Sequence, residues 1–232
     1  TFSITFATSD TDKTFWGIKD PDMFEDVTRL IPAAAEWLEL EAKPITSVHS
    51  MAGLLNRKRT LCGPNGIVVD SFHLVGDALI CTNPLYGRGC STGFWQAHLL
   101  AQSIQSNNND SIAQGERFAQ HIEDSILPWY SASVESDKGN RPSLKTDEDE
   151  LSVMKKSILK EGLIPATRTS AKVWRAFMKM MNLLAEPKIL SEPDISLEIM
   201  RVWEQRESRK PDPPLGPSRQ EMIEHLQLAE NV

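Results

Sequence analysis

Several residue types are scarce in this 232-residue sequence, and each scarcity excludes a class of protein. Only three cysteines occur, without a CxxC pair, which excludes a disulfide-stapled scaffold and favours a reduced, cytoplasmic setting. The five histidines are scattered without a metal-ligand spacing, so we expect no metal site. No apolar run reaches the roughly 20 residues that cross a bilayer, so we expect no membrane span. The cysteines are Cys62, Cys81 and Cys90.

Positive charge is also in short supply. The formal net charge is -7, and no basic stripe with interleaved aromatic residues occurs, which excludes nucleic acid as a partner. Hydrophobic residues make up 40% of the chain, an ordinary fraction for a globular core. We therefore expect a folded chain.

The first residues, TFSITFAT, alternate apolar and small polar side chains. This period of two predicts a half-buried strand over Phe2–Ala7. Because the sequence opens inside this pattern and without Met, we interpret it as a fragment whose N-terminal part is missing.

The next pattern is helical. Asp20-Pro21-Asp22 is a helix-start signal, and Pro32 should end that helix and open a second short one. The segment SVHSMAGLLNRKRTLC can form one or two strands, with Gly53 at a bend. Its three cations, Arg57, Lys58 and Arg59, fit either a solvated strand edge or a lining for an anionic substrate or cofactor.

A hairpin turn is expected at Asn65-Gly66, and the apolar run Phe72–Val75 has the length of a buried strand. Helical spacing over 91–104 predicts a helix buried on most of its surface. A second helix is expected over 111–129, and Pro128 should disturb it near its end. Further helices are expected between 151 and 204, and Ser218 with Glu221 has the spacing of a capping box.

The stretch GDALICTNPLYGRGCSTG, from Gly76 to Gly93, is the most informative part of the sequence. An acidic residue at the end of an expected strand can accept hydrogen bonds from ligand hydroxyl groups. The helix that follows begins with free N–H groups and a partial positive charge, which suit an electron-rich ligand oxygen. On spacing alone, an ordinary strand-to-helix connection and a ligand site are equally good interpretations.

This stretch resembles the second FAD-binding motif of the flavoprotein superfamily typified by p-hydroxybenzoate hydroxylase, in the order G-D-A, then P-x-x-G-x-G before a helix. The wording of Asn83–Gly87 is also similar to geranylgeranyl-reductase-like members, and a similar Asp and Pro occur in flavin-dependent halogenases. The resemblance implies that Asp77 binds the ribitol chain of FAD and that backbone N–H groups near Ser91–Gly93 face the N1/O2 side of the flavin. The implied cofactor-binding residues are Gly76, Asp77, Pro84, Gly87, Arg88, Gly89, Cys90, Ser91, Thr92 and Gly93.

The resemblance also implies an α/β fold class. We expect the remnant of an FAD-binding, Rossmann-like domain and a substrate-domain sheet, followed by a mainly helical C-terminal region. The corresponding division is a partial substrate-binding domain over 1–62, the C-terminal part of the FAD-binding domain over 63–134, a linker over 135–150 and the helical region over 151–232.

The implied function is that of an FAD-dependent oxidoreductase. We expect a flavin monooxygenase that acts on a small organic substrate with NAD(P)H and oxygen; the alternatives are a reductase of the geranylgeranyl reductase type and a non-catalytic helical interaction module. Leu79, Ile80 and Ser91 depart from the wording of many aromatic hydroxylases. No GxGxxG motif follows an expected strand, so we expect this chain alone to bind FAD weakly or not at all. The residues identify no catalytic acid or base, and His49 is a candidate only because histidine serves most often in that role.

Overall fold

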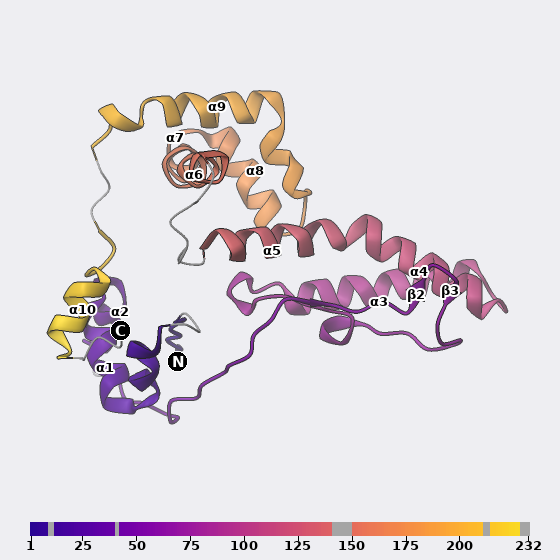
Figure 1. The fold of residues 1–232 in the computed structure, drawn as a ribbon, viewed down its shortest axis with the longest axis horizontal. Helices are drawn as coiled ribbons and strands as arrows, with labels where there is room; N and C mark the ends of the chain where they lie inside the picture. Colours follow the sequence, from indigo (N-terminus) through magenta and orange to yellow (C-terminus); the bar gives the residue numbers. More distant parts are fainter. Residues whose placement is uncertain (9–11, 40–41, 141–149, 211–213, 228–232) are drawn as a thin grey trace. The chain divides into compact units, whose positions relative to one another are not determined.

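The computed structural model describes residues 1–8, 12–39, 42–140, 150–210 and 214–227 (Figure 1). The chain divides into two compact units. Unit 1 combines Thr1–Ala52 with Lys210–Val232, and unit 2 is Gly53–Arg209. The protein is mostly helical, with few and short strands.

Unit 1 contains the 3₁₀-helix η1 (Lys13–Lys19) and the helices α1 (Pro21–Leu30), α2 (Pro32–Leu38) and α10 (Arg219–His225). The two expected helix starts are confirmed. Asp20 accepts hydrogen bonds from the backbone N–H groups of Asp22 and Met23, at 3.1 and 3.2 Å. The capping box is also confirmed, because Ser218 and Glu221 each accept a hydrogen bond from the other residue's backbone N–H.

The prediction of a strand over Phe2–Ala7 is wrong, because residues 1–8 contain no strand. Two aromatic side chains of this segment instead contact helices of the same unit. The ring of Phe2 lies 5.1 Å from that of Trp37, and the ring of Phe6 lies 5.0 Å from that of Phe24. Alternating apolar residues can thus anchor an extended segment on helices as well as in a sheet.

Unit 2 begins with short strands and 3₁₀ turns: β1 (Arg57–Lys58), β2 (Cys62–Gly63), β3 (Gly66–Ile67), η2 (Gly76–Ala78), β4 (Ile80–Cys81) and η3 (Pro84–Tyr86). The strands form two antiparallel pairs, β1 with β4 and β2 with β3. The hairpin at Asn65-Gly66 is confirmed, with Gly66 at φ 91°. The expected strand over Phe72–Val75 is absent, and Phe72 is 51% exposed, so this apolar run is not a buried core strand. We expected a larger sheet, whereas the strands among the described residues pair over two residues each.

The rest of unit 2 is helical: α3 (Gly89–Ser106), α4 (Ser111–Ser125), α5 (Leu127–Asn140), α6 (Glu150–Ser157), the π-helix η4 (Ile158–Leu163), α7 (Ile164–Thr169), α8 (Ala171–Met181), the 3₁₀-helix η5 (Pro187–Ser191), α9 (Pro193–Glu204) and the 3₁₀-helix η6 (Arg206–Ser208). The helix expected over 111–129 is divided at Ile126, close to Pro128, where we expected a disturbance because proline lacks the N–H of a continuous helix. Residues 135–140 were expected in a linker, and they continue α5 instead. Residues 141–149 of that expected linker lie outside the described residues.

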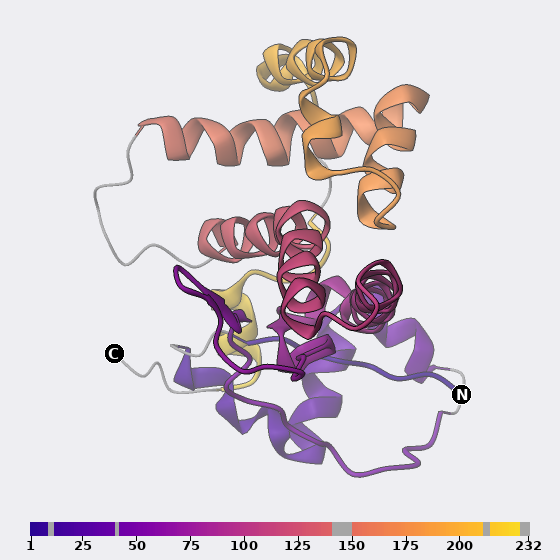
Figure 2. The ribbon, with the colours of Figure 1, turned by 90° about the vertical axis from the view of Figure 1, so that its right-hand side faces the viewer.

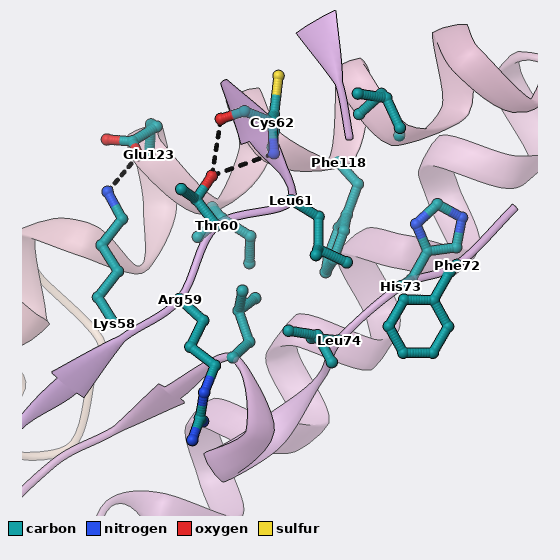
Figure 3. A pocket seen from close by; sticks show the side chains of 15 residues that line it. Lys58, Arg59, Thr60, Leu61, Cys62, Phe72, His73, Leu74, Phe118 and Glu123 are labelled. Atoms are coloured by element: carbon teal, nitrogen blue, oxygen red, sulfur yellow. Dashed lines mark hydrogen bonds and ion pairs between the residues drawn. The ribbon is translucent and has the colours of Figure 1, made fainter. Parts of the chain in front are cut away.

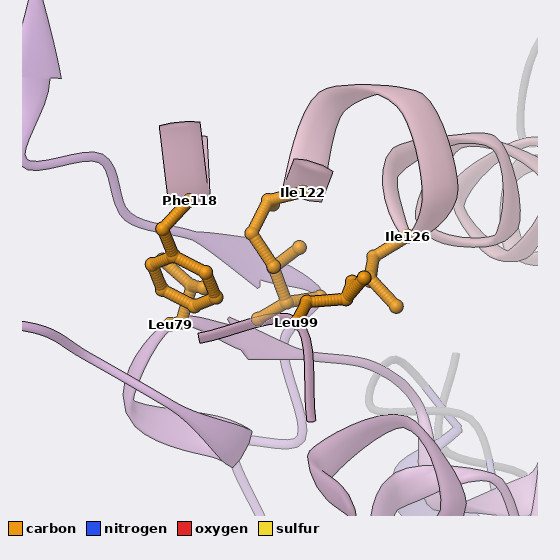
Figure 4. Close-up of a cluster of buried hydrophobic side chains, with 6 residues drawn as sticks. Leu79, Leu99, Phe118, Ile122 and Ile126 are labelled. Atoms are coloured by element: carbon orange, nitrogen blue, oxygen red, sulfur yellow. The ribbon is translucent and has the colours of Figure 1, made fainter. Parts of the chain in front are cut away.

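One hydrophobic cluster joins the strand–turn segment to α3, α4 and the start of α5 (Figure 4). Its buried members are Leu79, Ile80, Leu99, Phe118, Ile122 and Ile126. Helix α3 packs along α4, but it is not buried on most of its surface as expected. Phe94 is 78% exposed, whereas the buried residues of α3 are Gln96, Leu99 and Ser103, which share one helix face.

A second cluster holds α7, α8 and α9 together through Leu163, Ala166, Val173, Ala176, Ile195 and Ile199. Figure 2 shows α6, η4 and α7 as one continuous helix. Its π-helical part packs against α9. A Cβ atom built at Gly162 would lie 3.0 Å from Cβ of Trp203, so the absence of a side chain permits this close approach.

Candidate functional site

The site begins at a tight turn between an irregular segment and a short strand. Gly76 has φ 62°, in the left-handed region that favours glycine, and Asp77 follows it in η2. The buried side chains of Leu79 and Ile80 then fix the chain in the first hydrophobic cluster. Asp77 therefore lies on a turn anchored by burial, and not at the end of a regular strand as the sequence predicted.

Arg59, which follows β1 in the sequence, forms hydrogen bonds with this turn. The backbone N–H of Arg59 donates to the carbonyl oxygen of Leu79 at 2.8 Å, and its guanidinium donates to the carbonyl oxygen of Ala78 at 2.9 Å. Lys58 forms an ion pair with Glu123 of α4. Arg57 is exposed in its strand. Arg59 therefore contacts the turn, Lys58 contacts α4, and Arg57 lies at an exposed strand edge.

A second turn leads from β4 to α3. The side-chain oxygen of Asn83 accepts a hydrogen bond from the backbone N–H of Leu85 at 3.1 Å, and Pro84 occupies the first position of η3. Gly87 has φ 62°, and its N–H donates to the carbonyl oxygen of Pro84 at 2.9 Å. Glycine suits this position because a side chain strains a left-handed backbone.

Helix α3 begins at Gly89, two residues before the expected start at Ser91, and it packs against η2. A Cβ atom at Gly93 would lie 3.6 Å from Cα of Gly76, and one at Gly89 would lie 3.8 Å from Oδ1 of Asp77. Four of the ten residues implied by the resemblance, Gly76, Asp77, Gly89 and Gly93, thus lie close together at the N-terminal end of α3. Within the described part of the chain, the Asp77 carboxylate has no hydrogen bond or ion pair.

The other residues of the first turn of α3 are polar and largely accessible. Cys90 and Ser91 are exposed, whereas the hydroxyl of Thr92 donates back to the carbonyl oxygens of Arg88 and Gly89, at 3.0 and 3.1 Å. Arg88 is the N-cap residue, and no described side chain caps the first N–H groups of this helix. These N–H groups carry the positive end of the helix dipole.

The Arg88 side chain extends toward α5 and α8. Its guanidinium lies 5.5 Å from the ring centre of Tyr86 and 5.2 Å from that of Trp129, and it donates to the sulfur of Met181 at 3.4 Å. Burial lowers the pKa of Arg88 from its ordinary value, although the Tyr86 phenol opposes this shift. Arg88 therefore links the second turn to the helical part of unit 2.

Sequence reasoning missed one residue of this region. Asp137 of α5 accepts hydrogen bonds from the side chains of Asn56, Asn83 and Tyr86. Burial raises the pKa of the Tyr86 phenol, a hydrogen bond with Ser136 opposes this, and the charge of Asp137 raises it further. The signal was available, because Asp137 continues the helical spacing of the buried residues Ile126, Trp129 and Ser133.

A small pocket lies beside the first turn, between the segment after β1 and helix α4 (Figure 3). Leu61, Leu79 and Phe118 contribute apolar walls, and the ring of His73 lies edge-on to Phe118 at 6.0 Å. The cavity volume is about 50 Å³, several times the minimum of about 10–15 Å³ for one water but less than the about 150 Å³ of a cavity that binds benzene. As it stands, this pocket is too small for an aromatic substrate.

His49 belongs to unit 1, where it is exposed, whereas the two turns belong to unit 2. The residues described here hold no group of three or more His, Cys, Asp or Glu side chains placed to bind a metal ion. No helix in the described ranges combines the length and apolar character needed to cross a membrane.

No protein-family model matches this chain, and no curated protein gives a significant match.

Proposed function

We propose that the protein is an FAD-dependent oxidoreductase and that unit 2 carries part of its flavin site. The observation that carries this proposal is the convergence of Gly76, Asp77, Gly89 and Gly93 at the first turn of α3. The motif order came from the sequence resemblance, whereas the proximity of its two halves is a property of the fold. That proximity is what a single ligand touching both halves requires.

The chemistry of these groups fits the sugar-alcohol chain and ring of a flavin. The Asp77 carboxylate is exposed and has no partner among the described residues, so it is available to accept hydrogen bonds from ligand hydroxyl groups. The uncapped N–H groups of α3 can donate to an electron-rich ring oxygen, and their dipole favours negative charge on it. Bound FAD would supply the redox chemistry, while the protein would bind it, orient the substrate and exclude water.

Within this class we propose a monooxygenase that uses NAD(P)H and oxygen on a small organic substrate, in the cytoplasm. The three cysteines are free thiols, which supports a reducing compartment. The missing GxGxxG motif means that the pyrophosphate of FAD has no cradle of that type in this sequence. We propose that the Rossmann-like part which supplies it lies elsewhere in the full-length protein.

The test is the visible spectrum of the purified full-length protein. We expect flavin absorption bands, FAD among the compounds released on denaturation, and oxygen-dependent oxidation of NAD(P)H in the presence of substrate. If NAD(P)H oxidation does not require oxygen and is coupled to reduction of a substrate double bond, the result would favour the reductase. A folded, colourless protein that does not bind added FAD would sink the proposal and leave the helical interaction module.

A further inference from the structure

Asp137 connects three segments that are far apart in the sequence. One carboxylate oxygen accepts a hydrogen bond from Nδ2 of Asn56 at 2.6 Å. The other accepts from Nδ2 of Asn83 at 3.2 Å and from the hydroxyl of Tyr86 at 3.1 Å. Asn56 extends this set, because its side-chain oxygen accepts from the backbone N–H of Asn83 at 2.9 Å.

These hydrogen bonds stabilise the second turn, Asn83–Gly87, which has little burial and few hydrogen bonds of its own. Pro84, Leu85 and Gly87 are exposed, so burial contributes little to holding Asn83–Gly87 in one conformation. Two backbone hydrogen bonds lie within the turn, and one of them, from Tyr86 to Asn83, is long at 3.4 Å. Hydrogen bonds to a charged acceptor are stronger than those between neutral groups, and all three bonds to Asp137 are of this kind.

The turn matters because it sets the direction in which α3 begins. Only Arg88 separates Gly87 from Gly89, the first residue of that helix. A turn that changes conformation therefore moves the uncapped N–H groups of α3 relative to Asp77. Misplacement by about 1 Å at such a site is sufficient to weaken binding and catalysis strongly.

We propose that Asp137 is a positioning residue for the flavin site, which it serves by holding the turn Asn83–Gly87 through Asn83 and Tyr86. This inference rests on the proposed function, because it assigns Asp137 to the same site. Asp137 does not itself touch the cofactor in this assignment.

The first test measures FAD affinity of the full-length protein by fluorescence titration of the cofactor-free form. We expect Asp137→Ala to raise the dissociation constant at least about tenfold, the effect of losing roughly one charge-assisted hydrogen bond. The matched control is Asp124→Asn, on the exposed face of α4, where, among the described residues, the carboxylate accepts only a local hydrogen bond from Gln120. The control should stay within about twofold of the wild type, as surface substitutions do.

Tyr86→Phe gives a second, milder variant that removes one donor and keeps the ring. We expect a smaller loss of affinity than in Asp137→Ala. We also expect the double variant to lose less than the two single variants combined, because both act through one network. This variant keeps the proposal testable if Asp137→Ala does not fold.

Tyrosinate absorbance provides a readout that does not depend on flavin. These 232 residues contribute two tyrosines, Tyr86 and Tyr130, and the difference spectrum between the full-length wild type and its Tyr86→Phe variant assigns the Tyr86 titration. Loss of the nearby negative charge should lower the pKa of the Tyr86 phenol in Asp137→Asn relative to the wild type.

The outcomes separate the two proposals. If the wild type binds FAD, and both Asp137→Ala and Tyr86→Phe bind it equally well, the positioning role is overturned while the flavin site stands. If the wild type binds no FAD, both proposals fall. Weaker FAD binding in both variants, with an unchanged Asp124→Asn control and unchanged circular dichroism, supports the positioning role.

Discussion

Arg219 donates two hydrogen bonds to the carboxylate of Asp12 across 207 residues of sequence, with Nε 2.8 Å from Oδ2 and Nη2 3.0 Å from Oδ1. The guanidinium also lies 5.9 Å from the ring centre of Phe15, which is buried. The hydrogen bond from Arg219 is the largest cause of the lowered pKa of Asp12, and partial burial opposes it. This pair joins the first and last segments of unit 1.

We expect Arg219→Ala to lower the free energy of unfolding of unit 1 by about 1 kcal/mol near neutral pH, the upper range for an ion pair at a surface. Because the folded pKa of Asp12 is depressed, its contribution is fully present above the ordinary pKa and is lost as the pH falls through the folded pKa. Thermal unfolding at neutral and strongly acidic pH checks this. A difference between wild type and variant that stays the same at both pH values would contradict it. Arg29→Ala, which removes an exposed i,i+4 pair with Glu25, is the control and should cost less.

Asp77→Ala should abolish stoichiometric FAD binding by the full-length protein, or weaken it at least about tenfold, because a ligand hydroxyl would lose a charged acceptor. The measurement is the ratio of flavin absorbance to protein absorbance after purification, and the Asp124→Asn variant serves as the control. Full flavin content in Asp77→Ala would remove this residue from the site.

Gln96 is completely buried in α3, and neither its Oε1 nor its Nε2 forms a hydrogen bond with a described residue. Burying an unpaired amide costs free energy, whereas methionine has a similar shape without that cost. We expect Gln96→Met to raise the free energy of unfolding by about 1 kcal/mol in chemical denaturation. A loss of stability would mean that the amide has a polar partner in solution.

Ile126 lies at the junction of α4 and α5 and is only 1% exposed, in the same cluster as Leu79 and Ile80. Ile126→Ala should lower the free energy of unfolding of unit 2 by about 2–5 kcal/mol, because it leaves a cavity in the hydrophobic cluster that anchors the turn at Gly76–Ile80. Ile112→Ala, at a position that is 53% exposed, provides the matched control and should change stability by less than about 1 kcal/mol. Equal effects of the two variants in denaturant titrations would contradict this role of the cluster.

Local signals in the sequence were sufficient for much of the helical structure. Asp20, Pro32 and the Ser218–Glu221 pair each act through bonds within a few residues, so their effects could be predicted and are confirmed. The strands were harder, because a strand needs a partner that the sequence does not identify. Phe2–Ala7 has the alternation of a strand, yet its aromatic side chains contact α1 and α2.

In the candidate site, too, local backbone features could be predicted from the sequence, whereas contacts between distant residues could not. The glycines at 76 and 87 adopt the left-handed backbone that such turns require. The contribution of α5 depends on an interaction between Asp137 and Asn83, 54 residues apart. Polar composition made residues 135–140 look like a linker, and only the tertiary contacts show why an aspartate is useful on that helix.

The division of unit 1 between two distant segments has a consequence for synthesis of the protein. The ribosome makes Gly53–Arg209 before it makes Arg219, so unit 2 can form both of its hydrophobic clusters while unit 1 still lacks α10. At about 5–20 residues per second, synthesis of the chain between Ala52 and Arg219 lasts on the order of ten seconds or more. During that time Asp12 has no Arg219 to bind, and the early segment of the nascent chain has only local contacts of its own, such as those between α1 and α2.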